Sequence, residues 1–207
     1  MHLQRLLLLS VPLLPAVLAV DSPIDGYGVM IPEWEVEVTS GSTMVLAGTI
    51  EKVHEKLLQM NPNWNEEYNS TQNSAGNGKR DSNIHLFSRN VFSGAEYKCG
   101  GTLPECHPTG IATGIDYLRS VKGKPKNGPG PGNCGRVSCT QNGAIWWCND
   151  NASSKTLDGF GDIADGAEYL GKKCTRWGWE NGSYKAFLSG KAFHEDNWNV
   201  IVQKDSC

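Results

Sequence analysis

The first 98 residues of this chain contain no cysteine, and all seven cysteines follow them. The chain also has no C-x-x-C pair, since its two closest cysteines, Cys134 and Cys139, are separated by four residues. Structural zinc sites use closely paired ligands, so this spacing predicts no metal centre.

After residue 20 the chain has no apolar run that approaches the roughly 18 residues needed to span a bilayer. An integral membrane protein is therefore not expected. Residues 1–20 combine a positive charge at Arg5, an apolar run from Leu6 and small residues around Ala19. That order is typical of a secretory signal peptide, so the protein is predicted to be secreted and extracellular.

The sequence also lacks the G-x-S-x-G, H-E-x-x-H and Walker motifs. Its most enzyme-like cluster is His194-Glu195-Asp196, but consecutive side chains of a strand point to opposite faces, whereas catalytic groups must converge. We interpret this cluster as a polar turn. Asn149-Asp150-Asn151 lacks the remaining ligands of a calcium loop and is also interpreted as a turn. We therefore expect no catalytic residue, no metal, no cofactor and no enzyme, with a small secreted hydrolase as the least favoured alternative.

Charge is unevenly distributed along the chain, although the net charge is only −3. Residues 21–80 carry nine acidic and four basic residues, whereas residues 81–207 carry 13 acidic and 14 basic ones. This division suggests two units with different roles. It gives no basis for nucleic-acid binding, which requires an excess of basic residues.

In an oxidising compartment the cysteines of the C-terminal half predict a disulfide framework. Seven is an odd number, so one thiol is left over. The expected pairs, among many that remain open, are Cys139–Cys207, Cys148–Cys174 and Cys99–Cys134, with Cys106 as the odd cysteine. The glycosylation sequons, which fit a secretory route, begin at Asn69, Asn151 and Asn181.

The N-terminal part predicts a small β-β-α unit over residues 21–64. Apolar residues alternate with glutamates over Glu33–Val38, and Met44–Leu46 offers a second strand. A helix is expected from Thr49, with its apolar residues on one face, to the stop at Asn61-Pro62.

Residues 65–82 are polar and contain an Asn-Gly turn, so they are predicted to be a linker. Within them lies the dibasic pair Lys79-Arg80, a sequence that late-secretory proteases cut in exposed segments. We therefore expect residues 21–64 to be a pro-segment that is released from the cysteine-rich domain, residues 83–207.

That domain predicts helices over Ile111–Val121 and Leu157–Cys174, from apolar residues at helical spacing. Strands are expected over Val137–Cys139 and Ala144–Cys148, around an Asn142-Gly143 turn, and over Trp198–Val202. In the second of these strands, Ile145 and Trp147 should face one way and Trp146 and Cys148 the other.

The order of these elements resembles secreted proteins of filamentous ascomycete fungi and, more distantly, the killer toxin fold of smut-fungus viruses and necrosis-inducing fungal effectors. The resemblance is carried by the runs NCGRVSC, AIWWCNDN, FGDIADGAEYLGKKC and GKAFHEDNWNVIV and by the terminal cysteine. It implies an α+β fold, a disulfide-stapled sandwich of an antiparallel sheet with helices on one face. It also implies an extracellular effector or toxin-like protein that acts by binding.

Two groups of residues are candidates for binding the unknown extracellular target, which could be a membrane protein, an anionic surface or a glycan. The first is a basic cluster made of Arg119, Lys122, Lys124 and Lys126. The second is Trp177-Gly178-Trp179, in a segment expected to be a loop, whose indoles could stack on sugars. The leading hypothesis is a secreted effector or killer-toxin-like protein, and the alternative is a protein that binds carbohydrate or cell wall.

Overall fold

The computed structural model describes residues 21–67, 90–121 and 124–207. The expected signal peptide, the dibasic pair Lys79-Arg80, the sequon at Asn69 and the basic residue Lys122 lie outside these ranges.

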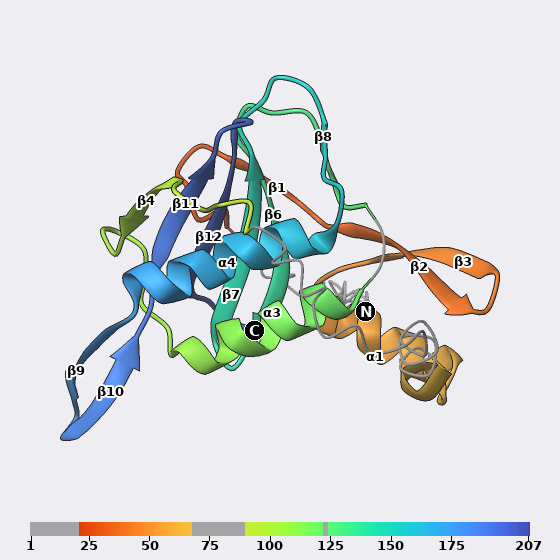
Figure 1. The fold of residues 1–207 in the computed structure, drawn as a ribbon, viewed down its shortest axis with the longest axis horizontal. Helices are drawn as coiled ribbons and strands as arrows, with labels where there is room; N and C mark the ends of the chain where they lie inside the picture. Colours follow the sequence, from red (N-terminus) through yellow and green to blue (C-terminus); the bar gives the residue numbers. More distant parts are fainter. Residues whose placement is uncertain (1–20, 68–89, 122–123) are drawn as a thin grey trace, which may run out of the picture.

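The fold is built around a mixed sheet with helices on one face, which confirms the predicted α+β class (Figure 1). Within the described residues six strands form this sheet, and all their pairings are antiparallel except that between β1 and β6. In sheet order the strands are β1 (Gly28–Met30), β6 (Asn133–Thr140), β7 (Gly143–Asn149), β12 (Trp198–Lys204), β11 (Gly190–His194) and β4 (Glu96–Cys99).

The central strand β7 is buried along its whole length, because both faces of the sheet are covered. Ile145 and Trp147 pack into the core beneath the helices, whereas Trp146 and Cys148 pack into a smaller cluster on the opposite face. The alternation predicted for this strand is therefore confirmed. Ile24, Tyr27 and Leu103 cover that opposite face, so the sheet lies between two apolar layers.

The turn that joins β6 to β7 lies one residue earlier than expected. Gln141 and Asn142 are its two central residues, with φ of 50° and 58°, and Gly143 already pairs with Thr140. Two-residue hairpins favour turns with positive φ at both central positions, because such turns match the twist of the strands. The register of the flanking strands thus places Gln141, rather than Gly143, in the left-handed region.

Helices α3 (Pro108–Ser120) and α4 (Phe160–Cys174) cover one face of the sheet (Figure 1), and Tyr27 packs on the other face. The apolar face predicted for α4 is buried from Phe160 through to Cys174. α3 packs so closely on the sheet that a Cβ atom at Gly114 would lie 2.3 Å from Ser138 Oγ. Glycine is required at this position by that close approach.

The predicted N-terminal β-β-α unit is present as β2 (Glu33–Thr39), β3 (Ser42–Ala47) and α1 (Ile50–Met60). Its apolar side chains belong to the same core as those of α3 and α4. The Trp34 indole, for example, stacks on the Phe160 ring with centroids 4.1 Å apart. Within the described residues, the N-terminal and cysteine-rich parts thus share one hydrophobic core.

Three disulfides connect the cysteine-rich part, and only one of the expected pairings, Cys139–Cys207, is formed. The other two expected pairings are wrong, because the bonds are Cys134–Cys148 and Cys99–Cys174. Cys134 lies directly opposite Cys148 across β6 and β7, and edge strand β4 brings Cys99 to the end of α4. Cys106 is free and buried.

Candidate functional site

The candidate site is a β-hairpin made of β9 (Arg176–Glu180) and β10 (Ser183–Phe187), which projects from the body of the molecule (Figure 1). Asn181 and Gly182 form its turn, with φ of 50° and 76°. Positive φ at both positions is the geometry that an Asn-Gly pair favours in a two-residue hairpin. The segment expected to be a loop at Trp177–Trp179 is therefore a strand.

Three aromatic side chains gather on one face of this hairpin. Trp177 and Trp179 are two residues apart and so point the same way, and Tyr184 is paired directly with Trp179. The Tyr184 ring lies 5.7 Å from the Trp177 ring at an interplanar angle of 20°, and 5.5 Å from the Trp179 ring. We call Trp177, Trp179 and Tyr184 the aromatic face.

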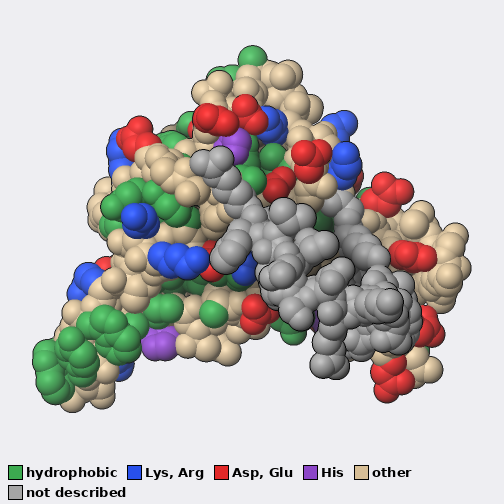
Figure 2. All heavy atoms as spheres, in the orientation of Figure 1, with side chains coloured by type: hydrophobic (Ala, Val, Ile, Leu, Met, Phe, Trp, Pro, Cys, Tyr) green, Lys and Arg blue, Asp and Glu red, His purple; other side chains and the backbone are tan. Residues whose placement is uncertain are grey.

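The three side chains of the aromatic face are largely exposed to solvent. The exposed fractions are 62% for Trp177, 74% for Trp179 and 58% for Tyr184, whereas the other five tryptophans are at most 7% exposed. Figure 2 shows an apolar patch at the end of the molecule that carries this hairpin. A contiguous exposed apolar patch is typical of a binding surface.

The base of the hairpin is fixed to the body at two points. Cys174, two residues before β9, is bonded to Cys99 in edge strand β4. Arg176 forms an ion pair with Glu105, and its guanidinium lies 4.6 Å from the centroid of the Phe187 ring. These contacts hold the aromatic face in a defined position before any ligand binds.

The basic candidates are not brought together as one free patch in the described residues. Arg119 Nη2 lies 3.1 Å from Asp165 Oδ1 and 2.5 Å from Glu168 Oε2. Lys124 pairs with Asp158 at 3.5 Å. Hydrogen bonds from Lys172 and Arg119 lower the pKa of the Glu168 carboxyl.

Lys126 lies exposed in the short strand β5 (Lys126–Asn127), which pairs with β8 (Lys155–Thr156). Arg119 and Lys124, two of the four residues of the basic cluster, are thus paired with carboxylates. The three residues of the cluster that the structure describes do not form a shared anion site. These residues are therefore a weaker candidate for a binding surface than the aromatic face.

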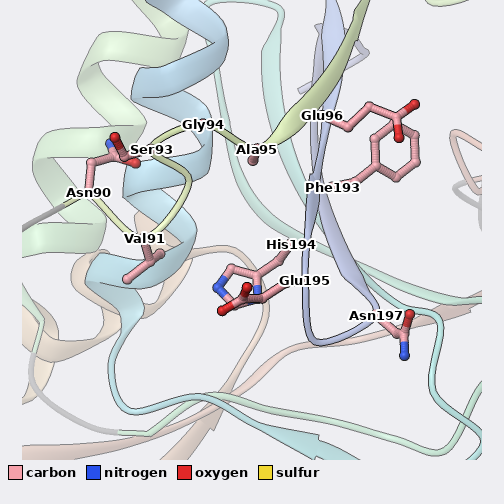
Figure 3. Close-up of a pocket in the computed structure, with 10 residues that line it drawn as sticks. All are labelled: Asn90, Val91, Ser93, Gly94, Ala95, Glu96, Phe193, His194, Glu195 and Asn197. Carbon is pink, nitrogen blue, oxygen red and sulfur yellow. The ribbon is translucent and has the colours of Figure 1, made fainter.

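His194 and Glu195 line an open hollow of about 840 Å³ at the end of β11 (Figure 3). Consecutive residues can both line it because β11 ends at His194 and Glu195 already belongs to the turn. Asp150 does not line this hollow, and its carboxylate instead accepts hydrogen bonds from Tyr27 Oη and Asn199 Nδ2.

His194 itself has a structural role in this hollow. Its ring stacks on Trp198 with centroids 4.6 Å apart, and its Nδ1 accepts a hydrogen bond from the Asp196 backbone N–H. The ring therefore both packs on the core and stabilises the turn that leads into β12.

The side chains of the Asn149-Asp150-Asn151 segment stabilise the surrounding loops through hydrogen bonds. Asn149 Nδ2 donates to the carbonyls of Gly128 and Ser153, and its Oδ1 accepts from Asn151. In the described part of the chain, no group of three or more His, Cys, Asp or Glu side chains is placed to hold a metal ion. No helix in that part is long and apolar enough to cross a membrane.

Comparisons of the chain with protein-family models, with curated proteins and with solved structures give no match. The site must therefore be interpreted from its own geometry.

Sequence reasoning missed Tyr184 as a member of the site. The signal was present, since two five-residue segments flank Asn181-Gly182, the strongest short hairpin motif. A two-residue turn fixes the register and so pairs Tyr184 with Trp179.

Proposed function

We propose that the protein is secreted and binds an uncharged structural polysaccharide through the aromatic face. The observation that carries the proposal is the exposure of Trp177, Trp179 and Tyr184 together on one face of a fixed hairpin. Within this proposal the protein keeps the effector-like role that its resemblance implies, and the polysaccharide is the surface on which it acts.

The chemistry of the rings supports a sugar polymer. Tryptophan and tyrosine offer a rigid apolar body together with a polar edge, which suits partners whose surfaces mix apolar and polar groups. The apolar faces of pyranose rings are such surfaces, and their neighbouring hydroxyls can bond with the Tyr184 hydroxyl. Because the rings are held in place, little side-chain entropy is lost on binding.

The charges of the hairpin support an uncharged partner. Arg176 pairs with Glu105, and Lys185 pairs with Glu180 at 3.3 Å. An anionic membrane attracts lysines and arginines that have no nearby carboxylate. Both basic residues of the hairpin, in contrast, are paired with a glutamate. A neutral polymer such as chitin or a β-glucan therefore fits the hairpin better than an anionic lipid surface.

Secretion is supported by the three disulfides, which are typical of extracellular proteins. Residues 1–20, whose basic, apolar and small residues follow the order of a signal peptide, support the same proposal. The dibasic pair Lys79-Arg80 adds an expected maturation step on the same route.

Retention on insoluble chitin and β-glucan tests the proposal. We expect the wild-type protein to be retained and the double variant Trp177→Ala/Trp179→Ala to pass through with an unchanged melting temperature. Ile31→Ala, which truncates a side chain that is 68% exposed outside the hairpin, is the control and should be retained. Equal retention of the double variant and the wild type would overturn the proposal. So would binding to anionic phospholipid vesicles, but to neither polymer, that depends on the same two tryptophans.

A further inference from the structure

Residues 21–67 supply part of the main sheet. β1 is the edge strand that runs parallel to β6, and Gly28 N donates to the Gly132 carbonyl at 2.7 Å. Met30 lies opposite Gly135 in this register, where a Cβ atom would be 2.6 Å from Met30 Sδ. β6 thus carries glycine where Met30 of the parallel strand β1 lies beside it, so the two segments fit closely.

The same residues also supply part of the core. Their buried apolar side chains pack together with those of α3 and α4 and have exposed fractions of at most 7%. These side chains are Trp34, Val36, Leu46, Ile50, Val53, Leu57 and Trp64. Removal of residues 21–67 would uncover the Phe160 ring and the core around it to water, and large exposed apolar surfaces of this kind favour association or aggregation.

Polar contacts fix the register between the two parts. The Glu51 carboxylate, in the first turn of α1, accepts hydrogen bonds from Ser138 Oγ at 2.5 Å and from Cys139 N at 3.1 Å. On the opposite face of the sheet, the Tyr27 hydroxyl donates to Asp150 Oδ1 at 2.9 Å. These contacts join residues more than 80 positions apart in the sequence.

No covalent bond other than the chain itself connects the two parts, because every cysteine follows residue 98. We infer that residues 21–67 are a permanent part of the domain rather than a segment released on maturation. Cleavage at Lys79-Arg80 then yields a noncovalent two-chain protein. In it, the partner of residues 90–207 is the N-terminal part of the same chain, and Glu51 is one of the polar residues that hold the two together. This inference does not depend on the polysaccharide proposal, because the aromatic face lies elsewhere.

The experiment uses the full chain from residue 21 to residue 207, with residues 78–81 replaced by the recognition site of a highly specific protease. After complete cleavage, verified by mass under denaturing conditions, native mass spectrometry and size exclusion measure whether the two fragments stay together. We expect one species containing both fragments, which separates only in denaturant. Separate elution of the N-terminal fragment under native conditions would overturn the inference.

A matched pair of variants tests the role of Glu51 in the cleaved protein. Glu51→Gln removes the charge that accepts the bonds from Ser138 and Cys139, whereas Glu55→Gln removes an exposed charge from the same helix. Hydrogen bonds to charged groups are stronger than those to neutral groups, so E51Q should raise the dissociation constant of the two fragments about tenfold. E55Q should match the wild type, and equal dissociation constants for both variants would contradict the role of Glu51.

Discussion

The disulfide between Cys99 and Cys174 joins edge strand β4 to the last residue of α4, immediately before the aromatic hairpin. The two cysteines are 75 positions apart, so the bond closes a long loop. The same bond therefore restricts the unfolded chain and fixes the base of the hairpin.

Removal of this bond should affect both stability and binding. We expect Cys99→Ala/Cys174→Ala to lower the free energy of unfolding by about 2–5 kcal/mol, because the unfolded chain gains conformational freedom. Polysaccharide retention should also weaken at temperatures where the variant is still folded. Thermal unfolding and retention measure the two effects, and retention equal to the wild type would show that the bond does not position the hairpin.

Single substitutions on the aromatic face should each weaken binding in part. An aromatic contact contributes about 0.5–1.5 kcal/mol beyond its buried area, so Tyr184→Ala should raise the dissociation constant at least two- to tenfold. Tyr184→Phe keeps the ring and should stay closer to the wild type. Binding isotherms on soluble oligosaccharides measure these constants, and equal losses in both variants would assign the effect to the hydroxyl instead of the ring.

Of the two described sequons, Asn181 should be glycosylated and Asn151 should not. Asn181 is exposed in the hairpin turn. The Asn151 Nδ2 atom, in contrast, lies within 3.1 Å of three acceptors, Asn149 Oδ1 and the carbonyls of Asp196 and Asn197. Peptide mass mapping after enzymatic deglycosylation of protein expressed through a secretory pathway checks this, and a glycan found at Asn151 would contradict the contacts of that loop.

Cys106 should react slowly with alkylating reagents in the folded protein. Burial raises the pKa of its thiol to about 11, so little thiolate forms at neutral pH. The unfolded thiol has its usual pKa near 9. The free energy of unfolding should therefore decrease as pH rises from about 9 to about 11, because the unfolded state loses its proton first.

Mass spectrometry after alkylation at neutral pH, with and without denaturant, measures this protection. One label per molecule should appear only in denaturant. A Cys106→Ala variant should show no label in either condition, which confirms the assignment of the free thiol.

Two glycines should respond oppositely to alanine. Gly114→Ala places a Cβ atom 2.3 Å from Ser138 Oγ and 2.9 Å from Ile145 Cδ1, so α3 must move and stability should fall by about 1–3 kcal/mol. At Gly171 in α4, a Cβ atom would have no neighbour within 4 Å, so Gly171→Ala should raise stability by up to about 1 kcal/mol. Chemical denaturation of both variants gives the two values, and a stabilised Gly114→Ala would contradict the packing of α3.

Features that depend on local periodicity could be predicted from the sequence alone. The alternation of Ile145, Trp146, Trp147 and Cys148 predicted which face of β7 each would occupy, since a strand repeats every two residues. The apolar spacing over Leu157–Cys174 predicted the buried face of α4 in the same way, although the helix itself begins at Phe160. The sequence also identified Trp177 and Trp179 as candidate binding residues.

Which distant segments become neighbours, in contrast, is known only from the folded chain. The pairing of Cys99 with Cys174 depends on β4 lying beside β11, and the place of residues 21–67 depends on β1 joining the edge of the sheet at β6. Such contacts arise from packing between segments far apart in the chain, on which local periodicity carries no information. The alternation over Glu33–Val38 placed Trp34 on an apolar face, but it could not identify Phe160 as its partner or show that Trp177 and Trp179 remain exposed.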